Sequence, residues 1–143
     1  MRTSLCIAAM LGFGISSALA GPQCNQQTTR GNYAFACEGE LPRGVPTRSL
    51  GTCTAGKSGD ISCKGYANLG GQIVTQELHG QANNNADCTG TVTYANTING
   101  QPAGVLEVQY VILDGGDTLK GLPTNSGGVL ACILNRMGGG DDR

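Results

Sequence analysis

Residues 51–64 read Gly-Thr-Cys-Thr-Ala-Gly-Lys-Ser-Gly-Asp-Ile-Ser-Cys-Lys, and this stretch predicts a β-hairpin closed by a disulfide. Cys53 and Cys63 are equidistant from Ser58, so a turn over residues 56–60 places them opposite each other. Glycine and aspartate are the residue types that adopt or cap such turns. The hairpin therefore favours an antiparallel, all-β fold.

The same alternation of β-prone runs and turn clusters continues along the chain, and no long segment repeats at the helical period. The expected strands are residues 31–41, 48–55, 60–68, 72–80, 88–96, 104–113, 116–122 and 128–136. Glycine, asparagine, aspartate and proline dominate the segments between them. Evenly spaced short strands predict a sandwich or a barrel. We expect an eight-stranded antiparallel up-and-down barrel, stapled by disulfides.

Cysteine pairing follows from that topology. Cys6 lies in the predicted leader, and the remaining six cysteines form three expected disulfides. The expected pairs are Cys53–Cys63 in the hairpin, Cys37–Cys132 between the first and last strands, and Cys24–Cys88. Cys37 and Cys132 both fall on the apolar face of their strands, as a buried bridge requires. The Cys37–Cys132 pairing depends on closure, because a sandwich would separate these strands.

Residues 1–20 have the pattern of a cleavable signal peptide. Arg2 supplies the positive charge, residues 5–13 form a short apolar run, and Ala18-Leu19-Ala20 is a small-x-small cleavage site. No later stretch approaches the ~20 apolar residues of a membrane-spanning helix. We expect a secreted or periplasmic protein, with a β-barrel domain over residues 21–137 and a flexible tail over 138–143.

The charge distribution argues against several partners. The formal net charge is −1, and loss of the leader with its single charge, Arg2, makes it −2. The basic residues are scattered, whereas nucleic-acid binding needs a concentrated basic face. Zinc sites need closely spaced ligand pairs, and the chain has neither a C-x₂₋₄-C pair nor a second histidine beside His79. We expect no metal, no cofactor and no nucleic acid, and the oligomeric state stays open.

Four segments carry a resemblance to small secreted bacterial proteins. They are residues 30–35 (Arg-Gly-Asn-Tyr-Ala-Phe), 51–54 with the Gly-x-x-Gly-Asp turn that follows, 87–93 and 111–116. That group is similar to the calycin-like barrels, such as lipocalins and the allene oxide cyclase and dirigent group. The resemblance implies an eight-stranded barrel but no single function, because this barrel serves carriers and isomerases alike. It supplies no catalytic residue that maps onto this chain, and its members usually carry fewer cysteines.

Tyrosines are the most promising polar-tipped side chains. If they line a barrel, they offer apolar walls with hydroxyl groups for a small ligand, and otherwise they fill the core. The candidate ligand-binding residues are Tyr33, Tyr66, Tyr94, Tyr110 and Glu107. Glu107 and Glu77 lie mid-strand and would form a glycosidase pair only if both pointed inward, whereas the alternation favours solvent.

No catalytic constellation stands out. His79 is interpreted as a surface residue at a strand end, no serine lies in a G-x-S-x-G elbow, and no phosphate-binding loop is present. The leading hypothesis is therefore a binding module for a compact apolar ligand. An isomerase or cyclase of the allene oxide cyclase or dirigent kind is the first alternative. A secreted structural or effector-like interaction protein is the second.

Overall fold

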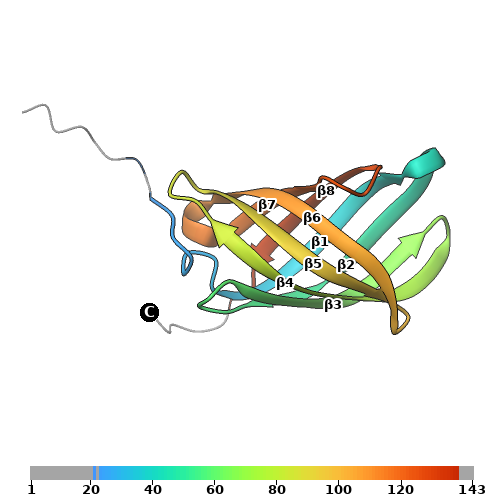
Figure 1. The fold of residues 1–143 in the computed structure, drawn as a ribbon, viewed down its shortest axis with the longest axis horizontal. Coiled ribbons are helices and arrows are strands. Elements are labelled where there is room, and N and C mark those ends of the chain that lie inside the picture. The colour runs from blue at the N-terminus through green and yellow to red at the C-terminus, as the bar shows by residue number, and fades with distance from the viewer. Residues whose placement is uncertain (1–20, 22, 139–143) are drawn as a thin grey trace, which may run out of the picture.

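The chain folds into one closed antiparallel β-barrel, in which each strand pairs with the next and the eighth pairs with the first. The computed structural model describes residues 21 and 23–138. The predicted signal peptide (1–20) and residues 139–143 of the predicted tail lie outside the described residues. Figure 1 shows an elongated barrel with the N-terminal segment at one end. Within the described part, no helix is long and apolar enough to cross a bilayer.

Two short 3₁₀ turns interrupt the series of strands. The elements are β1 (Gly31–Leu41), η1 (Pro42–Gly44), β2 (Val45–Ala55), β3 (Asp60–Leu69), β4 (Gln72–Asn84), β5 (Thr89–Ile98), β6 (Gln101–Leu113), η2 (Asp114–Gly116), β7 (Thr118–Pro123) and β8 (Val129–Arg136). The predicted eight-stranded barrel is confirmed. Several strands are longer than expected, because two-residue turns let pairing run up to the turn itself. Gly70 and Gly71 both have positive φ, as do Asn99 and Gly100, which is the conformation these tight hairpins need.

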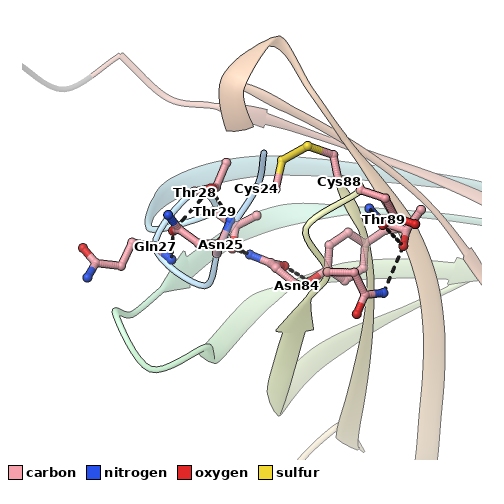
Figure 2. The surroundings of a disulfide bond; sticks show 11 residues. Cys24, Asn25, Gln27, Thr28, Thr29, Asn84, Cys88 and Thr89 are labelled. Atoms are coloured by element: carbon pink, nitrogen blue, oxygen red, sulfur yellow. Dashed lines mark hydrogen bonds between the residues drawn. A yellow bond between two sulfur atoms is a disulfide. The ribbon is translucent and has the colours of Figure 1, made fainter. Parts of the chain in front are cut away.

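All three predicted disulfides are confirmed. Cys53 pairs in register with Cys63 across β2 and β3, and Cys37 pairs in register with Cys132 across β1 and β8. The second bridge lies on the seam that closes the barrel. Cys24 bonds to Cys88 and so ties the segment before β1 to the β4–β5 loop (Figure 2).

Three inward-facing aromatic rings lie over glycines of the neighbouring strand. The register pairs are Phe35 with Gly51, Tyr94 with Gly80, and Tyr110 with Gly90. A β-carbon added at Gly51 would lie 2.7 Å from Phe35 Cε1, and one at Gly80 would lie 2.8 Å from Tyr94 Cδ1. Each ring therefore occupies the space that a side chain on the adjacent strand would take. This arrangement holds the rings against the wall and leaves room along the barrel axis.

Replacement of Gly90 by alanine tests this packing. The three atoms nearest to the added β-carbon all belong to the Tyr110 side chain, with Cε2 at 2.5 Å. We expect Gly90→Ala to lower the free energy of unfolding by about 2–3 kcal/mol, because the ring must move. In a Tyr110→Ala background the same change should cost less than about 1 kcal/mol. Urea denaturation of the four proteins measures the coupling, and additive losses would contradict the ring-over-glycine account.

The N-terminal segment closes one end of the barrel. Gln26 Nε2 donates to the Ala82 carbonyl (2.7 Å), and the Asn84 backbone N–H donates to Gln26 Oε1 (3.1 Å). Asn84 Nδ2 donates to the Asn25 carbonyl and to the buried Thr29 hydroxyl, at 2.9 and 3.0 Å. The contacts of Asn84 with Asn25 and Thr29 lie beside the Cys24–Cys88 bridge (Figure 2). The segment is thus held as a plug by one covalent bond and a polar network.

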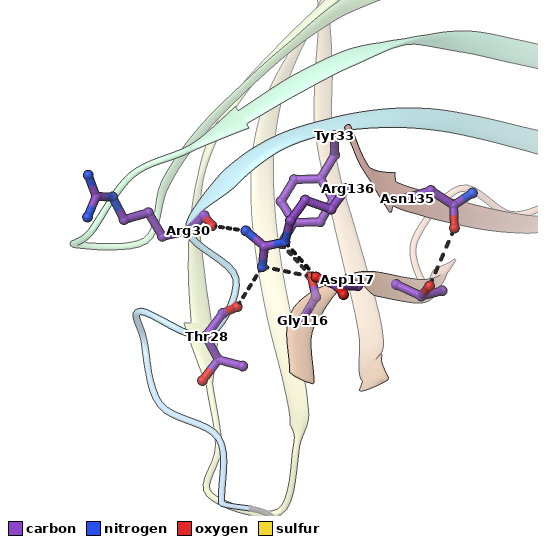
Figure 3. Close-up of polar contacts among 8 residues, drawn as sticks. Thr28, Arg30, Tyr33, Gly116, Asp117, Asn135 and Arg136 are labelled. Atoms are coloured by element: carbon purple, nitrogen blue, oxygen red, sulfur yellow. Dashed lines mark hydrogen bonds and ion pairs between the residues drawn. The ribbon is translucent and has the colours of Figure 1, made fainter. Parts of the chain in front are cut away.

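Arg136 fastens the same end from the other side (Figure 3). Its guanidinium donates to the carbonyls of Thr28, Arg30 and Gly116 and forms an ion pair with Asp117, with 2.9 Å between Nε and Oδ1. It also lies 5.1 Å from the centre of the Tyr33 ring. One side chain therefore joins the end of β8 to the plug segment and to η2.

Candidate functional site

The barrel interior contains two cavities of unequal size. The larger, of about 380 Å³, lies toward the end that carries η1 and the β3–β4 turn, and the smaller, of about 40 Å³, lies toward the plug. Four side chains line both cavities and so form the partition between them: Tyr94, Val108, Cys132 and Leu134. A volume of ~300 Å³ or more is typical of small-molecule sites. The larger cavity is therefore the candidate site.

The larger cavity reaches solvent beside a short strand. β7 pairs with β8 only as far as Gly121 and Cys132, so beyond this point β8 has a hydrogen-bonded neighbour, β1, on one side only. Past the end of β7, the side chain of Asn125 bonds to the backbone of β6. It accepts from Glu107 N–H (2.8 Å) and donates to the Val105 carbonyl (3.0 Å). Exposed Asn125 and Val105 line the cavity, which places its entrance here.

The lining is mostly apolar and carries no charge. The aliphatic and aromatic members include Phe35, Leu41, Leu69, Leu78, Ile98, Leu106, Leu130 and Leu134. The disulfides Cys37–Cys132 and Cys53–Cys63 also form part of the wall. Among the described residues, no Asp, Glu, Lys, Arg or His lines this cavity. Burial of an unpaired charge is costly, so the cavity suits an uncharged occupant.

A few polar side chains interrupt this apolar wall. Gln76 on β4 donates from Nε2 to Asn96 Oδ1 on β5 at 3.1 Å, and both line the larger cavity. Thr47 and Ser49 on β2 line it as well. Every fully enclosed side-chain nitrogen or oxygen in the described part has a hydrogen-bond partner. Thr47 and Ser49 have no such partner, so their hydroxyls border free space inside the barrel.

Three of the four candidate tyrosines face inward, in three different settings. Tyr33 is fully buried (0% exposed) at the plugged end, and its hydroxyl donates to the Gly116 carbonyl at 2.7 Å. The Tyr110 hydroxyl donates to Asn84 Oδ1, and its ring lines the smaller cavity. Tyr94, 7% exposed, lies on the partition and has no hydrogen bond within the described residues. Tyr94 is therefore the candidate that reaches the larger cavity.

Two candidates lie on the outer wall: for Tyr66 this corrects the expected place in the lining, whereas Glu107 points to solvent as the alternation indicated. Tyr66 is 59% exposed, because Cys63, Gly65 and Ala67 set the inward phase of β3 and Tyr66 falls between them. Glu107 is exposed because it alternates with the inward Leu106 and Val108 on β6. Neither residue is among those lining the two interior cavities.

Sequence reasoning missed Gln76 and Asn96, although the alternation pointed to them. Gln76 lies two residues before Leu78, and Asn96 lies two residues after Tyr94, so each shares the face of a buried neighbour. Tyrosines are obvious candidates for a ligand site because they are amphipathic, whereas an amide at the end of an expected strand, such as Asn96, resembles a turn residue. Strand phase was the better guide to the lining.

Buried tyrosines make the barrel sensitive to alkali. Burial raises the pKa of Tyr110 to about 12, and burial also raises the pKa of Tyr94 and of Tyr33. An unfolded tyrosine ionises near pH ~10, whereas these buried tyrosines stay neutral to higher pH. The stabilisation of the folded state by their neutral forms is therefore complete below pH ~10 and is lost as pH rises toward ~12. We expect the free energy of unfolding to fall by at least roughly 2 kcal/mol over this range. Urea denaturation between pH 8 and 11.5 checks this, and a flat profile would contradict it.

Outside the barrel, the remaining chemistry-bearing groups are dispersed. His79 is exposed on β4, with Nδ1 3.0 Å from Ser62 Oγ. In the described ranges, no group of three or more His, Cys, Asp or Glu side chains could hold a metal ion. No known family model, curated protein or solved structure matches this chain. The larger interior cavity is more enclosed than the open depression lined by exposed residues such as Glu38, Arg48 and Lys120, and we argue the function from it.

Proposed function

We propose that the protein binds a compact apolar molecule in the larger cavity of its barrel. The observation that carries this proposal is a space of about 380 Å³, lined mainly by apolar side chains and disulfides and open beside β7. Because the cavity opens to solvent, its apolar lining contacts water, and an apolar ligand would displace that water. Burial of an apolar ligand would recover about 25 cal/mol for each Å² removed from water.

Binding is favoured over turnover by the chemistry of the lining. The described part of the wall offers amides, hydroxyls and disulfides, but no carboxylate, imidazole or amine that exchanges protons near neutral pH. An isomerase or cyclase would have to act by shaping its substrate alone. We therefore infer a carrier or sequestering role, with the resemblance to lipocalin-like barrels as supporting context.

A secreted or periplasmic location fits this role. The three disulfides connect all six cysteines of the mature domain, and such bridges persist in oxidising compartments. Residues 1–20 would direct export and then be removed. N-terminal sequencing of the protein recovered from a bacterial host tests this proposal, since export predicts a mature start at Gly21.

A fluorescent probe tests the binding proposal. N-phenyl-1-naphthylamine emits strongly only in apolar surroundings, and we expect saturable emission with the wild-type domain. Ala67 is 4% exposed and lines the larger cavity, so Ala67→Phe should fill part of it. We expect this variant to weaken probe binding by at least roughly tenfold. Ala95→Phe is the matched control, because Ala95 is exposed on the outer face of β5, the strand beyond β4 from Ala67.

The outcomes separate cleanly when both variants retain the wild-type thermal transition. A selective loss in Ala67→Phe supports occupancy of the interior. Equal affinities in all three proteins would place the probe elsewhere and contradict the proposal. Absence of saturable emission from the wild type would also contradict the proposal and would favour a functional site on the outer surface.

A further inference from the structure

Tyr94 is a buried tyrosine whose hydroxyl has no hydrogen-bond partner among the described residues. Its side chain is 7% exposed, and no hydrogen bond joins it to any other described residue. Because every fully enclosed polar side-chain atom in this part of the chain is satisfied, the Tyr94 hydroxyl borders the free space that its ring lines. A hydroxyl that borders free space and has no partner in the protein is open to a hydrogen bond with whatever occupies that space.

The hydroxyls of the other two inward tyrosines both have a hydrogen-bond partner within the protein. Tyr33 donates to the Gly116 carbonyl, and Tyr110 donates to Asn84 Oδ1. Tyr94 differs because it lies on the partition between the two cavities and lines both of them. Burial raises its pKa, so the phenol stays protonated at neutral pH and can donate a hydrogen bond.

A second unused donor lies in the same cavity. Asn96 follows Tyr94 by two residues on β5, and its Oδ1 accepts from Gln76. This orientation leaves the Asn96 amide nitrogen, which carries two hydrogens, without a partner among the described residues. Tyr94 and Asn96 therefore both offer hydrogen-bond donors on this side of the cavity, beside the Gln76 Oε1 acceptor, in a wall that carries no charge.

We propose that the ligand is an uncharged molecule with a carbonyl oxygen on a compact apolar frame, and that the Tyr94 hydroxyl donates a hydrogen bond to this oxygen. This inference rests on the proposed binding function and names the ligand class for the same cavity. A ketone, ester or lactone has the required acceptor without the charge that this wall cannot pair. A pure hydrocarbon would leave the donor unsatisfied, and a carboxylate would lack a counter-charge.

Two isosteric ligands test the proposal. 2-Acetonaphthalene and 2-isopropenylnaphthalene share one skeleton and differ only in an oxygen against a methylene group. Each is titrated against bound N-phenyl-1-naphthylamine, with wild type and Tyr94→Phe. We expect Tyr94→Phe to weaken the ketone about tenfold and to change the alkene by less than about twofold.

Two controls guard the comparison. Tyr33→Phe removes a hydroxyl that is already bonded to Gly116 and lines neither interior cavity, so it should leave both affinities unchanged. Thermal melting without ligand should show no loss of stability in Tyr94→Phe, because the hydroxyl has no partner to lose. The carbonyl stretching frequency of the bound ketone needs no variant, and in the wild type it should lie below its value in cyclohexane.

Each possible result either supports or overturns the inference about the carbonyl ligand. Selective weakening of the ketone, together with a lowered carbonyl frequency, supports the inference. Parallel changes for ketone and alkene, a cyclohexane-like frequency, or failure of the ketone to displace a bound probe would overturn it and leave the binding function standing. Absence of probe binding to the wild type would overturn both, which keeps the two failures distinct.

Discussion

Replacement of Cys37 and Cys132 together by alanine is expected to lower the free energy of unfolding by about 4–5 kcal/mol. The bridge joins residues 95 apart in sequence. Without it, the unfolded ensemble regains the conformational entropy of a long loop, and this favours unfolding. The bridge also spans the β1–β8 seam, which joins the first and last strands of the chain and closes the barrel. Urea denaturation of the purified, oxidised double variant measures the loss.

The Cys53–Cys63 bridge provides the matched control. It also joins paired strands and lines the same cavity, but it spans only 10 residues of a hairpin that tight pairing already closes. We expect its double alanine variant to lose about 2–3 kcal/mol, less than the seam variant. Equal losses would show that wall packing, rather than loop closure, sets the contribution of these bridges.

The fold was predictable from the sequence because several local patterns agree. The spacing of Cys53 and Cys63 about Ser58 set a register, and the alternation around Cys37 and Cys132 placed both on the inner face. Closure of the barrel makes the first and last strands neighbours, and the Cys37–Cys132 bridge follows from it. Strand ends were less predictable, because asparagine and glycine serve both as turn residues and as the last paired positions of a hairpin.

The site was predictable only in part, and for a physical reason. Whether a barrel is hollow depends on where its rings lie, and that depends on register pairs such as Tyr110 with Gly90. Sequence composition shows the glycines and the tyrosines but not which of them face each other. Tyr66 is an example: it is the same residue type as Tyr94, but its position in the alternation of β3 turns its side chain outward.

Arg136→Met is expected to lower the free energy of unfolding by about 3 kcal/mol, with the loss centred on the plugged end of the barrel. Charge-assisted hydrogen bonds contribute more than neutral ones, and this guanidinium donates to three backbone carbonyls and pairs with Asp117. Its side chain is only 30% exposed, so solvent replaces these partners poorly when it is removed. Hydrogen exchange should accelerate in residues 24–31, which these contacts hold.

Two further variants separate the network from charge alone. Arg48 pairs with Glu38 at 3.7 Å, but both side chains are largely exposed (82% and 74%), so Arg48→Met should cost less than about 1 kcal/mol. Arg136→Lys retains the charge but not the planar fork, and a single ammonium cannot reach all the acceptors that Thr28, Arg30 and Gly116 present. Lysine should therefore recover less than half of the loss. Full recovery by lysine would mean that net charge holds the plug, whereas partial recovery places the stabilisation in the geometry of the guanidinium.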